Sequence, residues 1–154
     1  MRVAGTFVLA LGSAGAAAAD IARAGDGAAL FTQNCAMCHQ SDAVGLPGQY
    51  PRLTGRVGPI SAKKQGRAYL IHVVTYGMAG RIDVDQQTIL GVMPALGLSD
   101  EDAASVLSYL GGLGYPRATA FTAAEVATER ARGPMSGGEV NAERRNLRDA
   151  KVFE

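Results

Sequence analysis

The pentapeptide Cys35-Ala36-Met37-Cys38-His39 constrains this chain more than any other feature, because it contains both cysteines of the sequence. The pattern C-x-x-C-H is the attachment signature of c-type haem. Two residues between the thiols, on a tight helical turn, let both sulfurs reach the two vinyl-derived carbons on one porphyrin edge. The imidazole that follows then points at the iron. The motif therefore predicts one covalently attached haem c, with Cys35 and Cys38 as anchors and His39 as an iron ligand.

Other uses of paired cysteines fit this sequence less well. A thioredoxin-type redox pair follows a strand within a βαβ pattern, and no such pattern precedes Cys35. A zinc site needs four ligands, whereas the chain has two cysteines and two histidines without an H-x-x-x-H pair. A disulfide is common in exported proteins, but the histidine directly after Cys38 favours haem.

The second axial ligand is expected to be a methionine, because thioether sulfur is the usual partner of histidine in haem proteins that transfer electrons. Met93 is favoured because Pro94 holds it extended and a capped helix begins soon after, at Ser99. Met78 lies in the same glycine-containing segment and is the reserve candidate, with core packing as its expected role. His72 is placed off the apolar face of its helix and is interpreted as a surface histidine.

The first residues have the order of a secretory signal peptide. A short basic start is followed by the apolar run 3–11 and by small residues up to Ala19. We predict cleavage between Ala19 and Asp20, with export to the periplasm. The apolar run is well short of the roughly 20 residues that span a bilayer, and no later segment is predicted to cross a membrane.

Hydrophobic periodicity and capping signals predict an all-α fold, with no strand pattern long enough to build a sheet. Four helices are expected: 27–39, 62–76, 99–110 and 122–132. Glycines and prolines make 40–59 and 78–98 loops. The charged tail from 133 onward has few apolar residues, so it is expected to be extended or weakly helical unless a partner covers it.

Charge excludes one class of partner and suggests another. Removal of Arg2 with the signal leaves 14 of the 15 basic residues beside 14 acidic ones, so the mature chain is nearly neutral and gives no sign of nucleic-acid binding. Six basic residues and no acidic one lie between Arg52 and Arg81. This stretch is either a site that steers an acidic partner or a scattered solvated surface.

The chain resembles the class I cytochromes c from about residue 27 to residue 110. Five motifs match in the family's order: Gly27 with Phe31 and Cys35, the C-x-x-C-H motif, the P-x-L-x-G segment from Pro51 to Gly55, Met93-Pro94, and the helix face of Val106, Tyr109 and Leu110. The resemblance implies the class I fold, in which a few helices wrap around one haem. It also implies that the Pro51 carbonyl accepts a hydrogen bond from His39 and that Met93 is the axial thioether. The chain lacks tryptophan, so the haem-propionate tryptophan of many members is missing.

The chain is therefore divided into a signal peptide (1–19), a cytochrome domain (20–116) and a C-terminal extension (117–154) that is expected to contact a partner. The extension is similar to those of cytochromes that serve as subunits or acceptors of periplasmic dehydrogenases, such as sulfite or alcohol dehydrogenase. The resemblance implies an electron carrier rather than an enzyme, accepting electrons from a dehydrogenase and passing them to a terminal oxidase or another cytochrome. The alternative is a haem enzyme or a gas or redox sensor with an open sixth coordination site.

Overall fold

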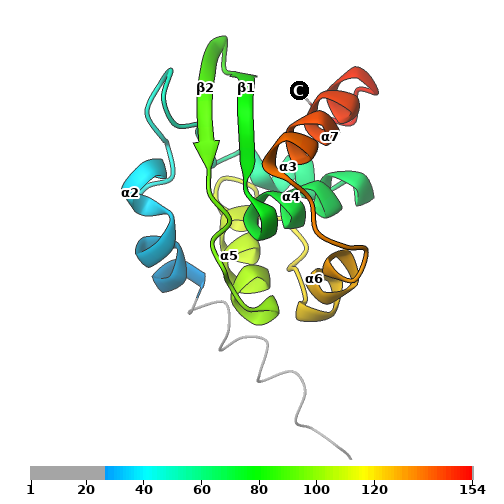
Figure 1. Cartoon of the computed structure of the whole chain (residues 1–154). Coiled ribbons are helices and arrows are strands. Elements are labelled where there is room, and N and C mark those ends of the chain that lie inside the picture. The colour runs from blue at the N-terminus through cyan, green and yellow to red at the C-terminus, as the bar shows by residue number, and fades with distance from the viewer. Residues whose placement is uncertain (1–26, 154) are drawn as a thin grey trace, which may run out of the picture.

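The computed structural model describes residues 27–153, so the predicted signal peptide lies outside the described residues. Residues 27–34 form a helix that a turn at Cys35 separates from the next element. The elements then follow in the order α2 (Ala36–His39), α3 (Val57–Ser61), α4 (Lys64–Tyr76), β1 (Met78–Val84), β2 (Gln87–Met93), α5 (Asp100–Gly112), α6 (Ala123–Arg130) and α7 (Gly137–Asp149) (Figure 1). No helix between residues 27 and 153 has both the length and the apolar character needed to cross a bilayer.

The N-terminal helix crosses α5 at very close range. A Cβ atom on Gly27 would lie 2.3 Å from the carbonyl oxygen of Ser105 and 2.9 Å from the Cβ of Tyr109. Phe31, one turn later, is fully buried, and its ring centroid lies 5.7 Å from that of Tyr109. Gly27 therefore allows the two helices to touch backbone to backbone.

The predicted helix starts are confirmed where a side chain caps the first turn. The Ser99 hydroxyl accepts a hydrogen bond from the Asp102 amide, and Thr122 forms a complete capping box with Glu125. Gly77 ends α4 with a φ of 74°, in the left-handed region that favours glycine. Caps are short-range interactions, so the local sequence is sufficient to identify them.

The prediction of an all-α fold is only partly confirmed, because the segment assigned to a loop contains an antiparallel hairpin. β1 pairs with β2 from Met78↔Met93 to Val84↔Gln87. Ile82, Val84 and Ile89 are buried on one face. The connecting residues Asp85 and Gln86 both have positive φ, 50° and 62°, which is typical of a tight hairpin turn. Such turns usually carry glycine, and its absence here removed the sequence signal.

The expectation that the tail is extended or weakly helical is wrong. α7 is a 13-residue helix with a capping box formed by Ser136 and Glu139. It packs on β1 and α4, and Val140 is fully buried. The amide of Asn141 donates to the carbonyls of Ala79 and Arg81, at 2.8 and 3.1 Å. Tertiary contacts with the same chain thus stabilise a helix that the sequence alone left marginal.

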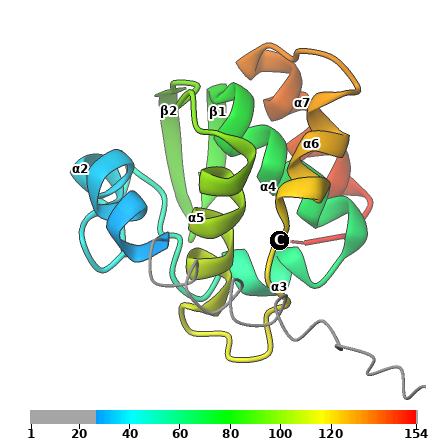
Figure 2. The same ribbon diagram turned by 90° about the horizontal axis from the view of Figure 1, so that it is seen from below.

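The extension also changes the environment of α4. Figures 1 and 2 show α6 and α7 on the side of α4 that lies away from the N-terminal helix. His72 faces these two helices and is 8% exposed. The interpretation of His72 as a surface histidine is therefore wrong, because α6 and α7 bury it.

The close crossing at Gly27 generates a stability prediction. Gly27→Ala places a methyl group against backbone atoms of α5, so the helices must separate and the free energy of unfolding should fall by about 1–3 kcal/mol. Gly112→Ala is the matched control, since a Cβ there meets nothing within 4 Å. The control should keep or raise stability, by up to about 1 kcal/mol. Denaturant unfolding followed by circular dichroism measures both, and equal stability of the two variants would contradict the crossing.

Candidate functional site

A cleft separates the N-terminal helix and its loop from the hairpin. It consists of two pockets of about 820 and 1010 Å³, volumes that include the solvent at their open mouths. Both pockets are lined by the same five residues: His39, Pro51, Met78, Ile82 and Met93. The inner pocket is closed by apolar side chains of α4 and α5, among them Leu70, Val74, Val106 and Leu107. A concave site lined mainly by apolar side chains, with a few polar groups, is typical of small-molecule and cofactor sites.

The two cysteines lie on the helical side of this cleft. Cys35 is buried and lines the inner pocket, whereas Cys38 is half-buried and lines the outer one. Burial, followed by the nearby Cys38, raises the pKa of the Cys35 thiol to about 11. Redox-active cysteine pairs depend on a lowered thiol pKa, so this environment disfavours a thiol–disulfide site. A thiol held at the wall of an apolar cavity suits covalent attachment of a cofactor.

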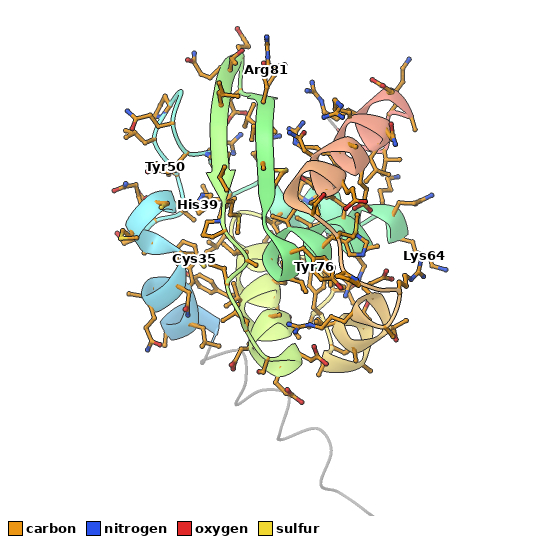
Figure 3. The ribbon with its side chains drawn as sticks, viewed as in Figure 1. Cys35, His39, Tyr50, Lys64, Tyr76 and Arg81 are labelled. Carbon is orange, nitrogen blue, oxygen red and sulfur yellow. The ribbon has the colours of Figure 1, made fainter. Side chains whose placement is uncertain are left out.

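The imidazole of His39 is oriented by the loop that follows it. Its Nδ1 donates to the Pro51 carbonyl oxygen at 2.9 Å, so Nε2 remains as the nitrogen with a free lone pair. Burial lowers the pKa of His39, with the Pro51 hydrogen bond as a smaller opposing effect. A neutral imidazole with a fixed tautomer is the form that ligates a metal. Figure 3 shows Cys35 and His39 on the side of their helical segment that faces the hairpin and α5.

Pro51 reaches His39 because the loop doubles back on itself. Leu46 and Tyr50 form an isolated antiparallel bridge. The Gly45 amide donates to the His39 carbonyl at 2.9 Å, and Gly45 has a φ of 69°. A Cβ on Gly45 would lie 2.4 Å from the Tyr50 carbonyl oxygen, so only glycine lets the chain pass here. The hydrogen bond expected between His39 and Pro51 is therefore built by local turn geometry.

Both candidate methionines reach the cleft from the open end of the hairpin, where Met78 and Met93 are paired across the strands. Met93 ends β2, so its backbone is extended as Pro94 predicted. Gly77 allows this arrangement, because a Cβ there would lie 2.3 Å from the Met93 carbonyl oxygen. The sulfur of Met78 accepts a contact from the Tyr69 hydroxyl at 3.7 Å. Met78 is thus held by a packing partner of its own.

The sequence did not identify Arg144 as a residue of the cleft. Arg144, on α7, is 5% exposed and lines the inner pocket together with Arg56. Its Nη2 donates to the Asp83 carbonyl at 3.1 Å, and burial lowers its pKa. The capping box at Ser136 could have identified the helix that carries Arg144, but not the face it turns to the cleft.

The residues of the cleft fit a haem. Two thiols and a neutral imidazole lie on one side, thioethers lie on the hairpin side, and the interior between them is apolar. The buried cation of Arg144 matches the carboxylate that a haem propionate would bring. These donors are soft sulfur and imidazole, the set that binds haem iron.

Comparison with known proteins agrees with this geometry. The family model described as cytochrome c oxidase, cbb3-type, subunit III matches residues 22–110. The chain is 41% identical to a cytochrome c-552 of Thermus thermophilus over 135 residues, which cover 79% of this chain and 96% of the relative. It is 40% identical to a second cytochrome c-552 of Thermus thermophilus, over 79% of this chain and 85% of that protein.

The family match extends over more than half of the chain, and the similarity to the Thermus proteins covers nearly the whole length of one of them. The C-x-x-C-H motif lies inside the matched region, on the wall of the cleft described above. This chain therefore belongs to the class I family of monohaem c-type cytochromes, and its cofactor is haem c.

Proposed function

We propose that this protein is a periplasmic carrier of single electrons, which accepts them from a dehydrogenase and delivers them to a terminal oxidase or another cytochrome. The main support for the proposal is that an imidazole lies on one wall of the cleft and a thioether lies on the facing wall. An iron with both axial positions filled by protein transfers electrons more readily than it binds oxygen or peroxide. The name of the matching family, a subunit of an oxidase, supports an oxidase as acceptor.

In this proposal the haem supplies the one-electron chemistry, and the chain binds and orients it. Cys35 and Cys38 hold the porphyrin edge as thioethers. His39 ligates the iron through Nε2, and the Pro51 carbonyl fixes its ring. Met93 is the second axial ligand.

Met93 is chosen over Met78 for two reasons. The sulfur of Met78 is engaged by the Tyr69 hydroxyl at 3.7 Å, inside a core that includes Tyr69. Met93 is the last residue of β2 and the last paired position of the hairpin, and Pro94 after it lies outside the strand. Its side chain is therefore better placed to adjust to an iron than one packed under a buried tyrosine.

The ligand assignment predicts different effects of two matched substitutions. Met93→Ala should lower the reduction potential by more than about 60 mV, a tenfold change in a one-electron equilibrium, and should open the iron to carbon monoxide. Met78→Ala should leave the iron closed. Redox titration and carbon monoxide binding to the reduced protein measure both. The reverse pattern would overturn the assignment, and rapid binding by the wild type would favour an enzyme or sensor.

Arg144 is proposed to pair with a haem propionate. Its guanidinium is buried on the wall of the cleft, and the Asp83 carbonyl together with the Tyr69 side chain satisfies only part of its five-donor fork. A buried cation near the iron favours the reduced state, which carries one positive charge fewer. Arg144 would thus both hold the haem and raise its potential.

Arg144→Gln should therefore lower the reduction potential by about 60 mV, a tenfold shift in the one-electron equilibrium. Arg81→Gln is the control, because it removes the same charge from a side chain that is 66% exposed on the hairpin (Figure 3). Potentiometric titration of both variants tests the pairing. A similar shift in the two variants would show that only net charge matters.

The outer mouth of the cleft offers an apolar contact surface. Its rim includes the exposed side chains of Tyr50, Leu90 and Val92, which are 39%, 79% and 75% exposed. Apolar patches of this kind mark contact sites, and redox proteins meet over small, transient interfaces, below roughly 1,200 Å².

Basic residues between Arg52 and Arg81 contribute less to such a surface than their number suggests. Arg52 and Arg56 both pair with Asp85, each at 3.0 Å, and Arg67 pairs with Glu125 at 2.9 Å. Acids distant in the sequence thus neutralise much of the basic stretch. We infer that partner docking relies on the apolar rim more than on charge.

The predicted extension 117–154 supports a carrier that acts alone. Its largest apolar side chains, including Phe121, Val126 and Val140, are buried against the same chain. The extension therefore needs no second subunit to cover it. A contact between the extension itself and a dehydrogenase would use the polar outer surfaces of α6 and α7.

The apolar rim can be tested without knowing the partner. Electron self-exchange between oxidised and reduced copies, measured by NMR line broadening, requires two cleft mouths to meet. Leu90→Asn should slow self-exchange about fivefold, because burial of part of this side chain stabilises a contact by about 1 kcal/mol. Ala127→Asn, on α6, is the control, since within the described residues α6 does not line the cleft. Equal rates in the two variants would argue against the rim.

A further inference from the structure

His72 joins three helices through its two ring nitrogens. It lies on α4, Nδ1 is 2.8 Å from Oε2 of Glu143 on α7, and Nε2 is 3.4 Å from Oε2 of Glu129 on α6. The side chains of His72 and Glu129 are 10% and 13% exposed, and that of Glu143 is 24% exposed. The cluster is thus largely shielded from water, and both carboxylates belong to the C-terminal extension.

This geometry selects the charged form of the imidazole. A neutral imidazole carries one N–H and can donate to one carboxylate, so its other nitrogen would turn a lone pair toward the second carboxylate. Only the imidazolium turns an N–H toward both carboxylates: it forms a hydrogen bond with Glu143 at 2.8 Å and an ion-pair contact with Glu129 at 3.4 Å. In agreement, the hydrogen bond to Glu143 and the charges of Glu143 and Glu129 raise the pKa of His72, while burial opposes the rise.

Several other ionisable groups on the helices around His72 have partners outside the cluster. α3 has none in its sequence. Elsewhere the pairs are Asp100 with Arg130 at 2.8 Å, Glu125 with Arg67 at 2.9 Å, and Arg144 and Arg148 with the Asp83 carbonyl. Arg132 contacts Glu129 at 3.0 Å but is 68% exposed, and the nearby Tyr76 hydroxyl donates to the Gly133 carbonyl. His72 is therefore the ion-pair partner of Glu143, and it shares Glu129 with the exposed Arg132.

We propose that protonated His72 is a pH-sensitive clamp that fastens both helices of the C-terminal extension to α4, and that loss of its proton loosens α6 and α7. The sign follows from linkage: a group whose pKa is higher in the folded state stabilises that state fully below its ordinary pKa, about 6.5. The stabilisation is lost as the pH rises from there through the higher folded-state pKa. The extension is thus held most firmly in acid.

The helix α7 connects the clamp to the cleft. Glu143 precedes Arg144, whose guanidinium lines the inner pocket, and Asn141 on the same helix holds the carbonyls of Ala79 and Arg81 in β1. Loosening α7 therefore moves the buried cation and the support of the hairpin together. This consequence rests on the proposed function, whereas the clamp itself does not.

Amide hydrogen exchange of the full haem-loaded chain tests the clamp. Between about pH 5.5 and about pH 8.5, the protection factors of 137–149 in the wild type should fall about tenfold, because deprotonation removes the charge that pairs with both carboxylates. His72→Gln should show low protection throughout and no such step. Arg67→Gln is the matched control, since its pair with Glu125 also joins α4 to α6 but contains no histidine. It should lower the protection of α6 equally at every pH.

Two results would overturn the clamp. One is a wild-type pH step no larger than that of His72→Gln. The other is an NMR titration of the wild type that places the pKa of His72 at or below about 6.5, a measurement that needs no variant to fold. The reduction potential followed over the same pH range separates the two proposals. A step in protection without a matching change in potential would support the clamp and overturn its coupling to the cleft, while failure to attach haem would contradict only the proposed function.

Discussion

The hydrogen bond between Nδ1 of His39 and the Pro51 carbonyl oxygen, at 2.9 Å, joins the two segments from which the rest of the site is built. It connects the end of the helical C-x-x-C-H motif to a loop that returns through Gly45 and the Leu46–Tyr50 bridge. The bond fixes which nitrogen of the ring carries the proton. Without it, the imidazole could rotate or protonate, and the first wall of the cleft would lose its metal-binding atom.

The opposite wall depends on contacts that are distant in the sequence. The hairpin turns its buried face of Ile82, Val84 and Ile89 to the cleft and carries both methionines at its open end. A two-stranded hairpin is marginal by itself. Here α7 stabilises it through Asn141, which binds β1, and through Arg144 and Arg148, which bind the Asp83 carbonyl. The C-terminal extension is therefore a structural part of the cleft.

The same arrangement relates the proposed clamp to the cofactor site. α7 has one face on β1 and the cleft, and it also turns Glu143 to His72. A change in the charge of His72 therefore acts on the helix that supports the hairpin. Because protein cores are close-packed, a shift of α7 changes the packing of the hairpin that forms one wall of the cofactor cleft.

What the sequence predicted well was local in origin. The helix caps at Ser99 and Thr122 bond to residues three positions away, and each was identified from its neighbours. The expected His39–Pro51 pair also forms, over only twelve positions. The hairpin was missed because Asp85-Gln86 lacks the glycine of a typical tight turn. The helix α7 was missed because its polar sequence is stabilised by burial against β1 and α4.

The sequence by itself determined that this chain attaches one haem through Cys35 and Cys38 beside His39, because covalent reach along a single helical turn depends on spacing alone. Tertiary structure alone decided the burial of His72, its contact with Glu143 and the position of Arg144 at the cleft. Both depend on α7 folding back across the domain, more than 60 positions after the segments it contacts. Electrostatic environment is the sum of such distant contacts, and no local pattern encodes it.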